Sequence, residues 1–319
     1  MRTLRLEILV TALAVALVAT ACGDPEDENN ANNTNNIVDA GDVDGGPDAD
    51  PDGDADTSTL EITSESIVEN PNNVLSAIAT VETNEPTTLS IEVSSTDHSF
   101  TVESSGDATD AHDVFVPGMR AETDYTITVT AENADGDSVD GEPVDFTTSA
   151  LPEGMPPVEV TVNDADSVQP GITIFDVFRF SPDLDPAWGY LVGVDEEGYV
   201  VWYYNVSGQP QDVSPTSDGT LIMTVRDEEI REINMRGEVL NEWTIEDLGL
   251  DTVHHEITEL PNGNFATLST ERRTIDGYDD GAGGTVSHEV IGDVAVEFSR
   301  DGTIVHQHSM FDVLDPKRK

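Results

Sequence analysis

The residues with the clearest capacity for chemistry are two adjacent histidines, His254 and His255, followed directly by Glu256. Histidine is the usual general acid or base near neutral pH. Taken alone, a histidine pair at the start of a strand is more often a packing or surface feature than a catalytic one. Neighbouring side chains of a strand point to opposite faces, so we expect only one of the two rings to line a central channel.

Two other groups of side chains are candidates for binding. Arg272 and Arg273 lie at the start of a Gly/Asp-rich insertion and could reach an anion near a channel mouth, although a solvated loop explains them as well. His306 and His308 share one face of a predicted strand, with a spacing that could hold a metal. They stand where the other repeats have Trp or Glu, which favours strand surface, and we predict no metal site.

The charge of the chain excludes one class of partner. Its 319 residues carry 65 Asp and Glu against 13 Lys and Arg, a formal net charge of -52. Nucleic acid is excluded because binding phosphates needs clustered Lys and Arg. An anionic membrane surface is disfavoured for the same reason.

The first residues predict export. Residues 1–21 have a basic start and then an apolar run too short to span a bilayer, which is the pattern of a signal peptide. The run ends at Cys22, the only cysteine, in a context that resembles a bacterial lipobox. We therefore expect a lipidated Cys22 and a periplasmic or cell-surface lipoprotein of a bacterial envelope, in contact with membrane only through its lipid. The alternative is ordinary cleavage after Ala21, which also means export.

Residues 22–57 predict an extended acidic linker. They are rich in Asn, Asp, Gly and Pro and contain no basic residue, so they have little to bury and their charges repel. The run from Asp48 to Asp56 matches the first nine positions of a calcium loop, but position twelve is Thr59 and no helices flank it. A solvated linker is the better interpretation.

Residues 58–150 predict a β-sandwich, because short strands with alternating apolar residues recur between turn signals. The stretch from Val116 to Thr148 resembles the second half of a fibronectin type III domain. That resemblance implies that Tyr125 forms the tyrosine corner and that Phe146 lies on the last strand. We interpret this module as a spacer or a lid.

Residues 157–319 contain a repeat that predicts β-propeller blades. Turns ending in Gly198, Gly237 and Gly302 each precede a strand, and a second glycine turn recurs in phase at Gly219 and Gly263. A period of about 40 residues with strand-turn-strand chemistry is typical of propellers. Three blades and part of a fourth would not close a ring, so we expect an incomplete propeller, the N-terminal fragment of a longer protein. The alternative is a small four-bladed or oligomeric propeller.

Three motifs resemble one known family. The stretch His254 to Asn264 reads His-His-Glu, then Leu-Pro-Asn-Gly-Asn. Together with Tyr190 to Trp202 and with the Leu-Asp-Pro-Lys-Arg element of 314–318, it resembles the PAPS-independent arylsulfotransferases. The resemblance covers about residues 60–319, and Glu256 stands where the family more often has Asp.

The resemblance implies a six-bladed propeller with the active site in its central channel. It also implies transfer of a sulfuryl group from a phenolic sulfate ester to a phenol through a sulfohistidine, without a nucleotide or other cofactor. By this resemblance, His255 contacts the sulfuryl group or the leaving oxygen, and His254 is the second candidate. The sulfonated histidine and its arginine partner belong to later motifs of the family, so no histidine of this chain is assigned to that role.

The sequence therefore predicts an all-β protein in which an immunoglobulin-like or fibronectin III-like sandwich is followed by propeller blades. For function, it favours an aryl sulfotransferase. The competing hypothesis is a non-catalytic surface lipoprotein whose propeller binds ligands or proteins. A propeller hydrolase is weaker, because no Ser/His/Asp constellation is visible in the sequence.

Overall fold

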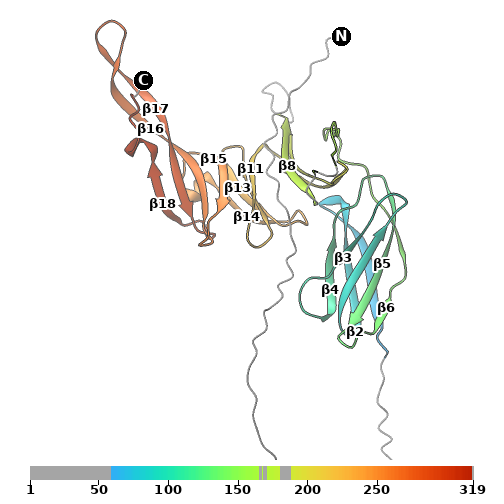
Figure 1. Ribbon diagram of the computed structural model, residues 1–319. Helices are drawn as coiled ribbons and strands as arrows, with labels where there is room; N and C mark the ends of the chain where they lie inside the picture. Colours follow the sequence, from blue (N-terminus) through green and yellow to red (C-terminus); the bar gives the residue numbers. More distant parts are fainter. Residues whose placement is uncertain (1–58, 165–166, 168–170, 180–187, 318–319) are drawn as a thin grey trace, which may run out of the picture.

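The structure, a computed structural model, describes residues 59–164, 167, 171–179 and 188–317 (Figure 1). The predicted signal peptide, Cys22 and the acidic linker lie outside these residues. The described chain is all-β, with one short helix, α1 (Ile245–Leu248), and one 3-10 turn, η1 (Met310–Asp312). Among the described residues, no helix has the length and apolar character needed to cross a membrane.

The first seven strands form an antiparallel sandwich organised by one long strand. Strand β2 pairs with β1 and β4 through its first half and with β3 and β5 through its second half, and β5 also pairs with β6 and β7. One continuous strand therefore contributes to both layers of the sandwich. The strands are β1 (Ile62–Asn70), β2 (Asn73–Ser94), β3 (Ser99–Glu103), β4 (Thr109–Val116), β5 (Asp124–Asn133), β6 (Ser138–Asp140) and β7 (Val144–Thr147).

Alternate residues of these strands fill the sandwich core. The apolar positions that alternate in the sequence from Leu89 and from Tyr125 are all buried there, as the period of a half-buried strand predicts. The phenolic oxygen of Tyr125 accepts a hydrogen bond from the Arg120 backbone N–H at 2.9 Å. The predicted tyrosine corner is therefore confirmed, and Phe146 lies buried on the last strand, β7.

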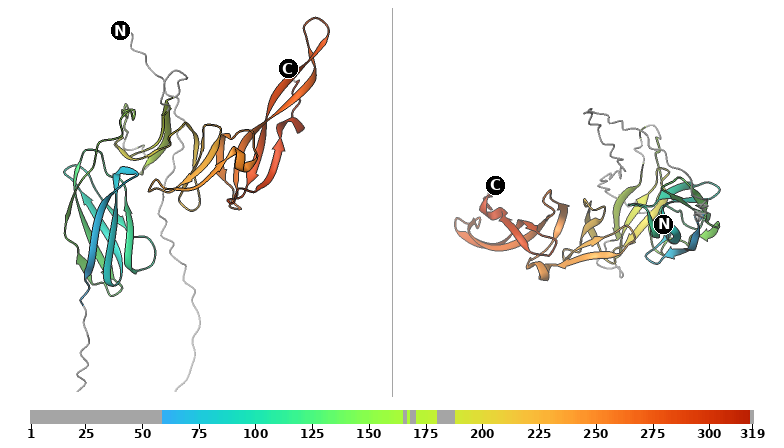
Figure 2. Two further views of the ribbon diagram at one scale, coloured as in Figure 1. Left: turned by 180° about the vertical axis from the view of Figure 1, so that it is seen from behind. Right: turned by 90° about the horizontal axis from the view of Figure 1, so that it is seen from below.

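The remaining strands form three antiparallel sheets that follow one another away from the sandwich (Figure 2). Within each sheet, strands that are consecutive in the sequence are neighbours. The third sheet carries a long hairpin of β16 and β17 that extends beyond its other strands (Figure 1). Sheet one is β8 (Thr173–Arg179), β9 (Trp188–Val194) and β10 (Val200–Asn205); sheet two is β11 (Pro210–Pro215), β12 (Leu221–Val225), β13 (Glu229–Ile233) and β14 (Val239–Thr244); sheet three is β15 (His254–Glu259), β16 (Phe265–Asp279), β17 (Thr285–Phe298) and β18 (Ile304–Ser309).

The three sheets pack face to face, as blades do. Leu221 and Met223 of the second sheet lie in a cluster with Leu191 and Trp202 of the first sheet. Residues of opposite parity, such as Ile222, lie in a second cluster with residues of the third sheet. Because alternate side chains of β12 point to opposite faces, this strand packs against both the first and the third sheet. The number of blades in a closed ring stays a prediction.

The repeated turns explain why tryptophan recurs beside glycine. Trp202 follows the first turn, and its indole N–H donates to the Met235 carbonyl in the next turn at 2.8 Å. Trp243 follows that second turn, and a Cβ added to Gly302 of the third turn would lie 3.2 Å from the Trp243 ring. Each tryptophan thus packs on the turn of the following sheet. The glycine-turn repeat predicted from the sequence therefore corresponds to contacts between neighbouring sheets.

The sandwich is attached to the first two sheets by polar and apolar contacts. Arg120 forms an ion pair with Asp195 at 2.6 Å, and both side chains are largely buried. Arg236 of the second sheet forms an ion pair with Asp113 at 2.6 Å. Leu75 is fully buried among residues of the first sheet. A role as a mobile lid would require these contacts to break.

Candidate active site

The histidine pair lies at the start of β15, the first strand of the third sheet. Strand β15 pairs with β16 on one side, and its other side lies against β11, the first strand of the second sheet. The two strands are the corresponding edges of neighbouring sheets, where a propeller places its central channel. His254 and His255 thus lie on the edge strand of the third sheet that faces the second sheet, and the lining of a central channel by this edge stays a prediction.

A bulge interrupts the strand at this point. His254 pairs with Leu268 and Ile257 pairs with the adjacent Thr267, so two residues of β15 have no partner position on β16. Those two residues are His255 and Glu256. Bulges re-aim side chains and are common beside active sites.

His255 has a left-handed backbone with φ of 56°. A residue with a Cβ adopts this region only at a cost, so surrounding contacts must hold it. Its N–H donates to the Gln211 side-chain oxygen at 3.3 Å, and its carbonyl accepts from the Thr224 hydroxyl at 3.2 Å. Both partners belong to the second sheet.

The bulge overturns one expectation from the sequence. The rings of His254 and His255 lie 5.2 Å apart, centroid to centroid, and meet edge to face. The prediction that they point to opposite faces is wrong, because the left-handed residue breaks the alternation of the strand. Both rings therefore belong to one site.

The two imidazoles differ in exposure and partners. His255 is exposed, whereas the His254 side chain is 16% exposed and its Nε2 lies 3.7 Å from a carboxylate oxygen of Asp293. That nitrogen has no hydrogen-bond partner among the described residues. His255 is thus the ring that a substrate can reach, and His254 is the ring that stands behind it.

Two half-buried carboxyl groups lie on the neighbouring sheets, Asp212 next to the histidine pair and Asp176 next to Asp212. Burial raises the pKa of Asp212, and the charge of Glu256 raises it further, while a hydrogen bond from the Ile257 backbone N–H opposes the change. Burial also raises the pKa of Asp176 on β8, where a backbone hydrogen bond opposes it and Asp212 adds to it.

The two arginines lie further along the hairpin. Arg272 and Arg273 stand on β16 four and five positions beyond the partner of His254, which is roughly 13 Å at the rise of a strand. Arg272 pairs with Glu289 at 3.2 Å, and both side chains are exposed. Arg273 pairs with Glu271 at 3.0 Å and with Asp312 at 3.2 Å. The structure does not bring them into contact with the histidine pair.

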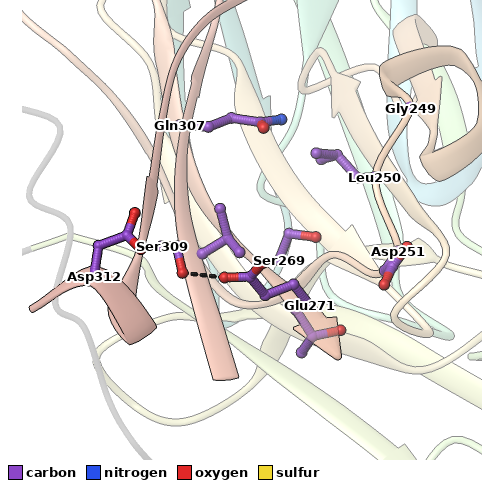
Figure 3. A pocket seen from close by; sticks show the side chains of 10 residues that line it. Gly249, Leu250, Asp251, Ser269, Glu271, Gln307, Ser309 and Asp312 are labelled. Carbon is purple, nitrogen blue, oxygen red and sulfur yellow. Dashed lines mark hydrogen bonds between the residues drawn. The ribbon is translucent and has the colours of Figure 1, made fainter. Parts of the chain in front are cut away.

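A polar hollow of about 280 Å³ lies beside Arg273, between α1 and the strands β16 and β18 (Figure 3). The side chains of Glu271 and Ser309 meet across it in a hydrogen bond. Its other lining residues include Asp251, Gln307 and Asp312. Acidic and neutral groups dominate, so the hollow does not suit a sulfate ester.

The other histidines have structural positions. His98 bonds to the Tyr125 phenol at 3.0 Å and His112 to the Thr87 hydroxyl at 3.0 Å, both within the sandwich. His306 and His308 are exposed on β18. In the described part of the chain, no group of three or more His, Cys, Asp or Glu side chains is arranged to hold a metal ion.

Gln211, Asp212 and Thr224 are the residues of this site that sequence reasoning missed. They lie on β11 and β12, about 30 to 45 positions before the histidines, and reach them only because the two sheets pack together. A signal was present in the repeat, since Asp212 and Glu256 stand at the same distance from the glycines of their own turns, Gly219 and Gly263.

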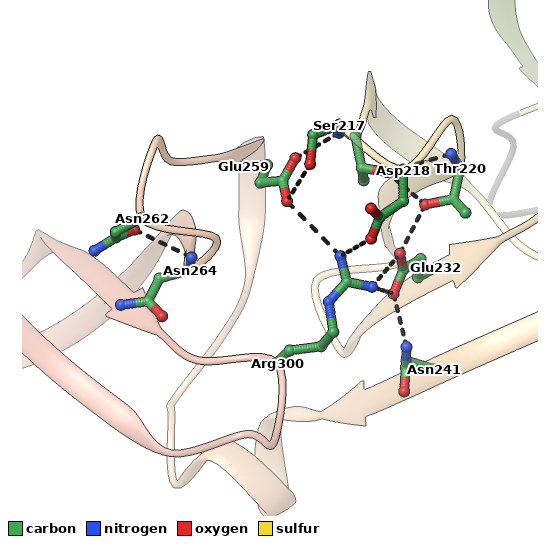
Figure 4. A network of polar contacts seen from close by, with 10 residues as sticks. Ser217, Asp218, Thr220, Glu232, Asn241, Glu259, Asn262, Asn264 and Arg300 are labelled. Carbon is green, nitrogen blue, oxygen red and sulfur yellow. Dashed lines mark hydrogen bonds and ion pairs between the residues drawn. The ribbon is translucent and has the colours of Figure 1, made fainter. Parts of the chain in front are cut away.

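The other end of β15 carries a dense polar network (Figure 4). The Glu232 carboxylate is fully buried and accepts hydrogen bonds from Thr220, Asn241 and Arg300. Glu259, at the end of β15, accepts from the Ser217 backbone N–H at 2.6 Å. These contacts join the second and third sheets.

Comparison with known families gives matches over both parts of the chain. The family described as arylsulfotransferase (ASST) matches residues 162–319, and the family described as the arylsulfotransferase Ig-like domain matches residues 66–148. No curated protein sequence matches the chain significantly.

Two solved structures show weak likeness. A protein of unknown function from Bacteroides caccae is 12% identical, with 70% of this chain and 94% of that chain covered and a TM-score of 0.25. BamB from Moraxella catarrhalis is 11% identical, with 73% of each chain covered and a TM-score of 0.20. At TM-scores this low, neither structure indicates the fold or the function of the chain.

Proposed function

Because the chain belongs to the arylsulfotransferase family, we propose that it moves a sulfuryl group from a phenolic sulfate ester to a phenol, with His255 at the reacting group. The family implies an aryl sulfate donor and a phenolic acceptor. We also propose that the reaction uses no nucleotide or other cofactor.

The observation that carries the proposal is the presentation of His255. Its ring is exposed at the sheet edge, its backbone is left-handed, and two side chains of the neighbouring sheet bind its N–H and its carbonyl. Strained residues that are held by many contacts are typical of functional sites.

The proposed chemistry proceeds in two balanced steps. By the family resemblance, the imidazole that attacks sulfur belongs to a later motif and is none of the histidines of this chain. As its nitrogen bonds to sulfur, the bond from sulfur to the phenolic oxygen breaks, and the departing phenolate takes a proton from an imidazolium of this chain. The acceptor phenol then gives up its proton as its oxygen bonds to sulfur and the sulfur–nitrogen bond breaks. Each step needs only acid, base and donors to the sulfuryl oxygens.

His255 is proposed as the acid and sulfuryl contact, not as the nucleophile. An exposed imidazolium can donate to a sulfuryl oxygen or to the leaving phenolate, and it is the reachable ring of the pair. His254 is proposed to support it through the edge-to-face contact. Because its Nε2 has only a distant carboxylate, at 3.7 Å, it retains a free position for a proton or a water.

Arg272 is too far from His255 to touch the same sulfuryl group, and we propose that it attracts the anionic substrate toward the site; it is the better of the two predicted arginines for that role. Its ion pair with Glu289 is exposed and therefore weak, so an anion can compete with the carboxylate. Arg273 has two carboxylate partners and also lies over the Phe311 ring, with its guanidinium carbon 5.0 Å from the ring centre.

We further propose that the protein works outside the cytoplasm, attached to a bacterial membrane through a lipid on Cys22. The support is the sequence of residues 1–22, with its basic start, short apolar run and lipobox-like end.

We propose that the chain is the N-terminal part of a longer enzyme whose later motifs supply the nucleophile, so the test is an assay of the protein that includes those motifs, with 4-nitrophenyl sulfate as donor and phenol as acceptor. We expect nitrophenolate release together with phenyl sulfate. His255→Ala should lower kcat by roughly 100-fold or more, the usual contribution of a general acid. His306→Ala, which removes an exposed histidine of β18, is the matched control and should have no effect.

Two results would contradict the proposal. One is a folded His255→Ala variant that transfers sulfuryl groups at the wild-type rate. The other is a wild-type protein that includes the later motifs and binds the ester without turnover, which would support the competing ligand-binding function.

A further inference from the structure

We propose that Asp212, together with Gln211 and Thr224, is a positioning residue that fixes the direction of the His255 imidazole from the neighbouring sheet. The inference rests on the proposed function of His255, because a positioning residue has meaning only beside a working group. It concerns the second sheet, which carries no residue predicted for the reaction.

The three side chains bind three backbone groups of the bulge. Gln211 accepts from the His255 N–H at 3.3 Å, Thr224 donates to the His255 carbonyl at 3.2 Å, and Asp212 accepts from the Ile257 N–H at 2.9 Å. A regular strand would direct alternate groups of this kind to its ladder partner on β16. Here the second sheet binds these three groups, while the Thr267 hydroxyl of β16 donates to the Glu256 carbonyl at 3.0 Å.

The local chain cannot hold this geometry by itself. His255 lies in the left-handed region, at a cost of about 1–2 kcal/mol for a residue with a Cβ. The register of β15 gives it no opposite residue on β16. The conformation therefore persists because contacts from outside the strand determine it, and φ in turn sets the direction of the Cα–Cβ bond.

The burial of the contacts matches a positioning role. Thr224 is fully buried, so its hydroxyl has little freedom and its bond to the His255 carbonyl excludes water. Asp212 is half-buried and carries the only charge among the three. A hydrogen bond from a backbone N–H to a carboxylate is stronger than a neutral one, so Asp212 is the strongest of the three anchors.

The repeat shows how the arrangement differs from an ordinary contact between sheets. Gln211 and Asp212 stand in the second sheet where His255 and Glu256 stand in the third, counted from the turn glycines. In the second sheet both side chains of the pair bind the next sheet. In the third sheet the first position is an exposed imidazole, so that position presents a ring for chemistry.

Glu259, a carboxylate at the opposite end of β15, makes a contact that can be compared directly with that of Asp212. Both accept a backbone N–H across the same pair of sheets, Asp212 from Ile257 at 2.9 Å and Glu259 from Ser217 at 2.6 Å. If such bonds only join sheets, removing either should act alike. If Asp212 positions His255, only its removal should change the ring.

The experiment follows the His255 ring by two-dimensional NMR in the full chain labelled with ¹⁵N-histidine, with His255→Asn assigning its signals. The variants are Asp212→Ala, which removes the anchor, Asp212→Asn, which keeps an oxygen acceptor, and Glu259→Ala as the matched control. We expect the His255 ring signals to move or broaden in Asp212→Ala, to stay close to wild type in Asp212→Asn, and to stay unchanged in Glu259→Ala.

Activity supplies a second readout. Asp212→Ala should lower kcat for 4-nitrophenyl sulfate roughly 10- to 100-fold with little change in KM, as expected for a misplaced catalytic group, and Asp212→Asn should restore it. If Asp212→Ala does not fold, Thr224→Val removes the hydroxyl at nearly constant volume and should change the same ring signals.

The inference is overturned if the His255 signals are the same in wild type and Asp212→Ala, or if Glu259→Ala moves them as much. A wild-type protein that includes the later motifs but has no activity would contradict the proposed function alone, because the ring signals report the positioning with no substrate present.

Discussion

The two ends of β15 join the same pair of sheets in opposite ways. At the His255 end, an exposed ring stands on a strained backbone beside carboxyl groups whose pKa values are raised. At the Glu259 end, a fully buried carboxylate, Glu232, has a complete set of hydrogen-bond donors. The difference shows that one end is built for stability, whereas the other keeps polar groups available.

The pKa of the carboxyl group is shifted in opposite directions at the two ends. Burial alone would raise the pKa of Glu232, but hydrogen bonds from Thr220, Asn241 and Arg300 hold the pKa below its usual value. Burial prevails at Asp212, so its pKa is raised. A carboxylate that stabilises the fold and one that costs stability thus lie in the same sheet, Glu232 on β13 and Asp212 on β11.

The largest expected effect is at the Glu232 end. Glu232→Ala removes the acceptor for three donors and leaves Arg300 without its buried partner, so the free energy of unfolding should fall by about 3 kcal/mol. Urea unfolding of this variant measures the loss. Glu246→Ala, at an exposed carboxylate on α1, is the control, and an equally small loss in both variants would contradict the comparison.

Acid should weaken that end selectively. Because the folded pKa of Glu232 is depressed, its contribution is present above the unfolded pKa of about 4.5 and is lost as the pH falls through the folded value. The difference in unfolding free energy between wild type and Glu232→Gln should therefore be constant at neutral pH and should shrink below pH ~4.5. A difference that does not change on acidification would refute this assignment.

A pair of glycines tests how tightly the Glu232 side of the sheets is packed. Gly302 and Gly263 have nearly equal φ values, 83° and 80°, but a Cβ on Gly302 would lie 3.2 Å from the Trp243 ring whereas a Cβ on Gly263 meets nothing within 4 Å. Alanine at either position should cost about 1 kcal/mol for its backbone conformation. Gly302→Ala should cost more in thermal unfolding, and equal costs would show that the tryptophan yields freely.

The smallest expected effect is at the His255 end and has the opposite sign. Asp212→Asn removes a charge whose folded pKa is raised, so it should stabilise the protein at pH 7 by at most about 0.5 kcal/mol after allowance for solvent screening. Wild type gains stability as the pH falls through the raised pKa, so the advantage of the variant should disappear there. A loss of stability at pH 7 would place Asp212 with the stabilising carboxylates.

The elements of the fold that depend on local pattern could be predicted from the sequence. Alternation identified the strands around Leu89 and Tyr125, and the glycines of the repeat identified turns between neighbouring strands. The families that match the chain agree with the resemblance on which His255 was selected. Local period and turn chemistry were sufficient for these features.

The contacts of the site could not be predicted in the same way. The bulge at His255 depends on side chains about 30 to 45 positions earlier in the chain, which alternation within β15 does not encode. The assumption of a regular strand therefore gave the wrong relation between His254 and His255. The ion pairs of Arg273 with Glu271 and Asp312 could not be predicted either, because they depend on how the hairpin packs against the last turn.

The most direct test of the central claim is a titration of the ¹⁵N-histidine-labelled chain with 4-nitrophenyl sulfate, followed by NMR. The account predicts that the His255 ring signals move with saturation, followed by those of His254, while His98 and His112 in the sandwich stay unchanged. Saturable binding that leaves His255 unmoved, or equal shifts at all histidines, would contradict it.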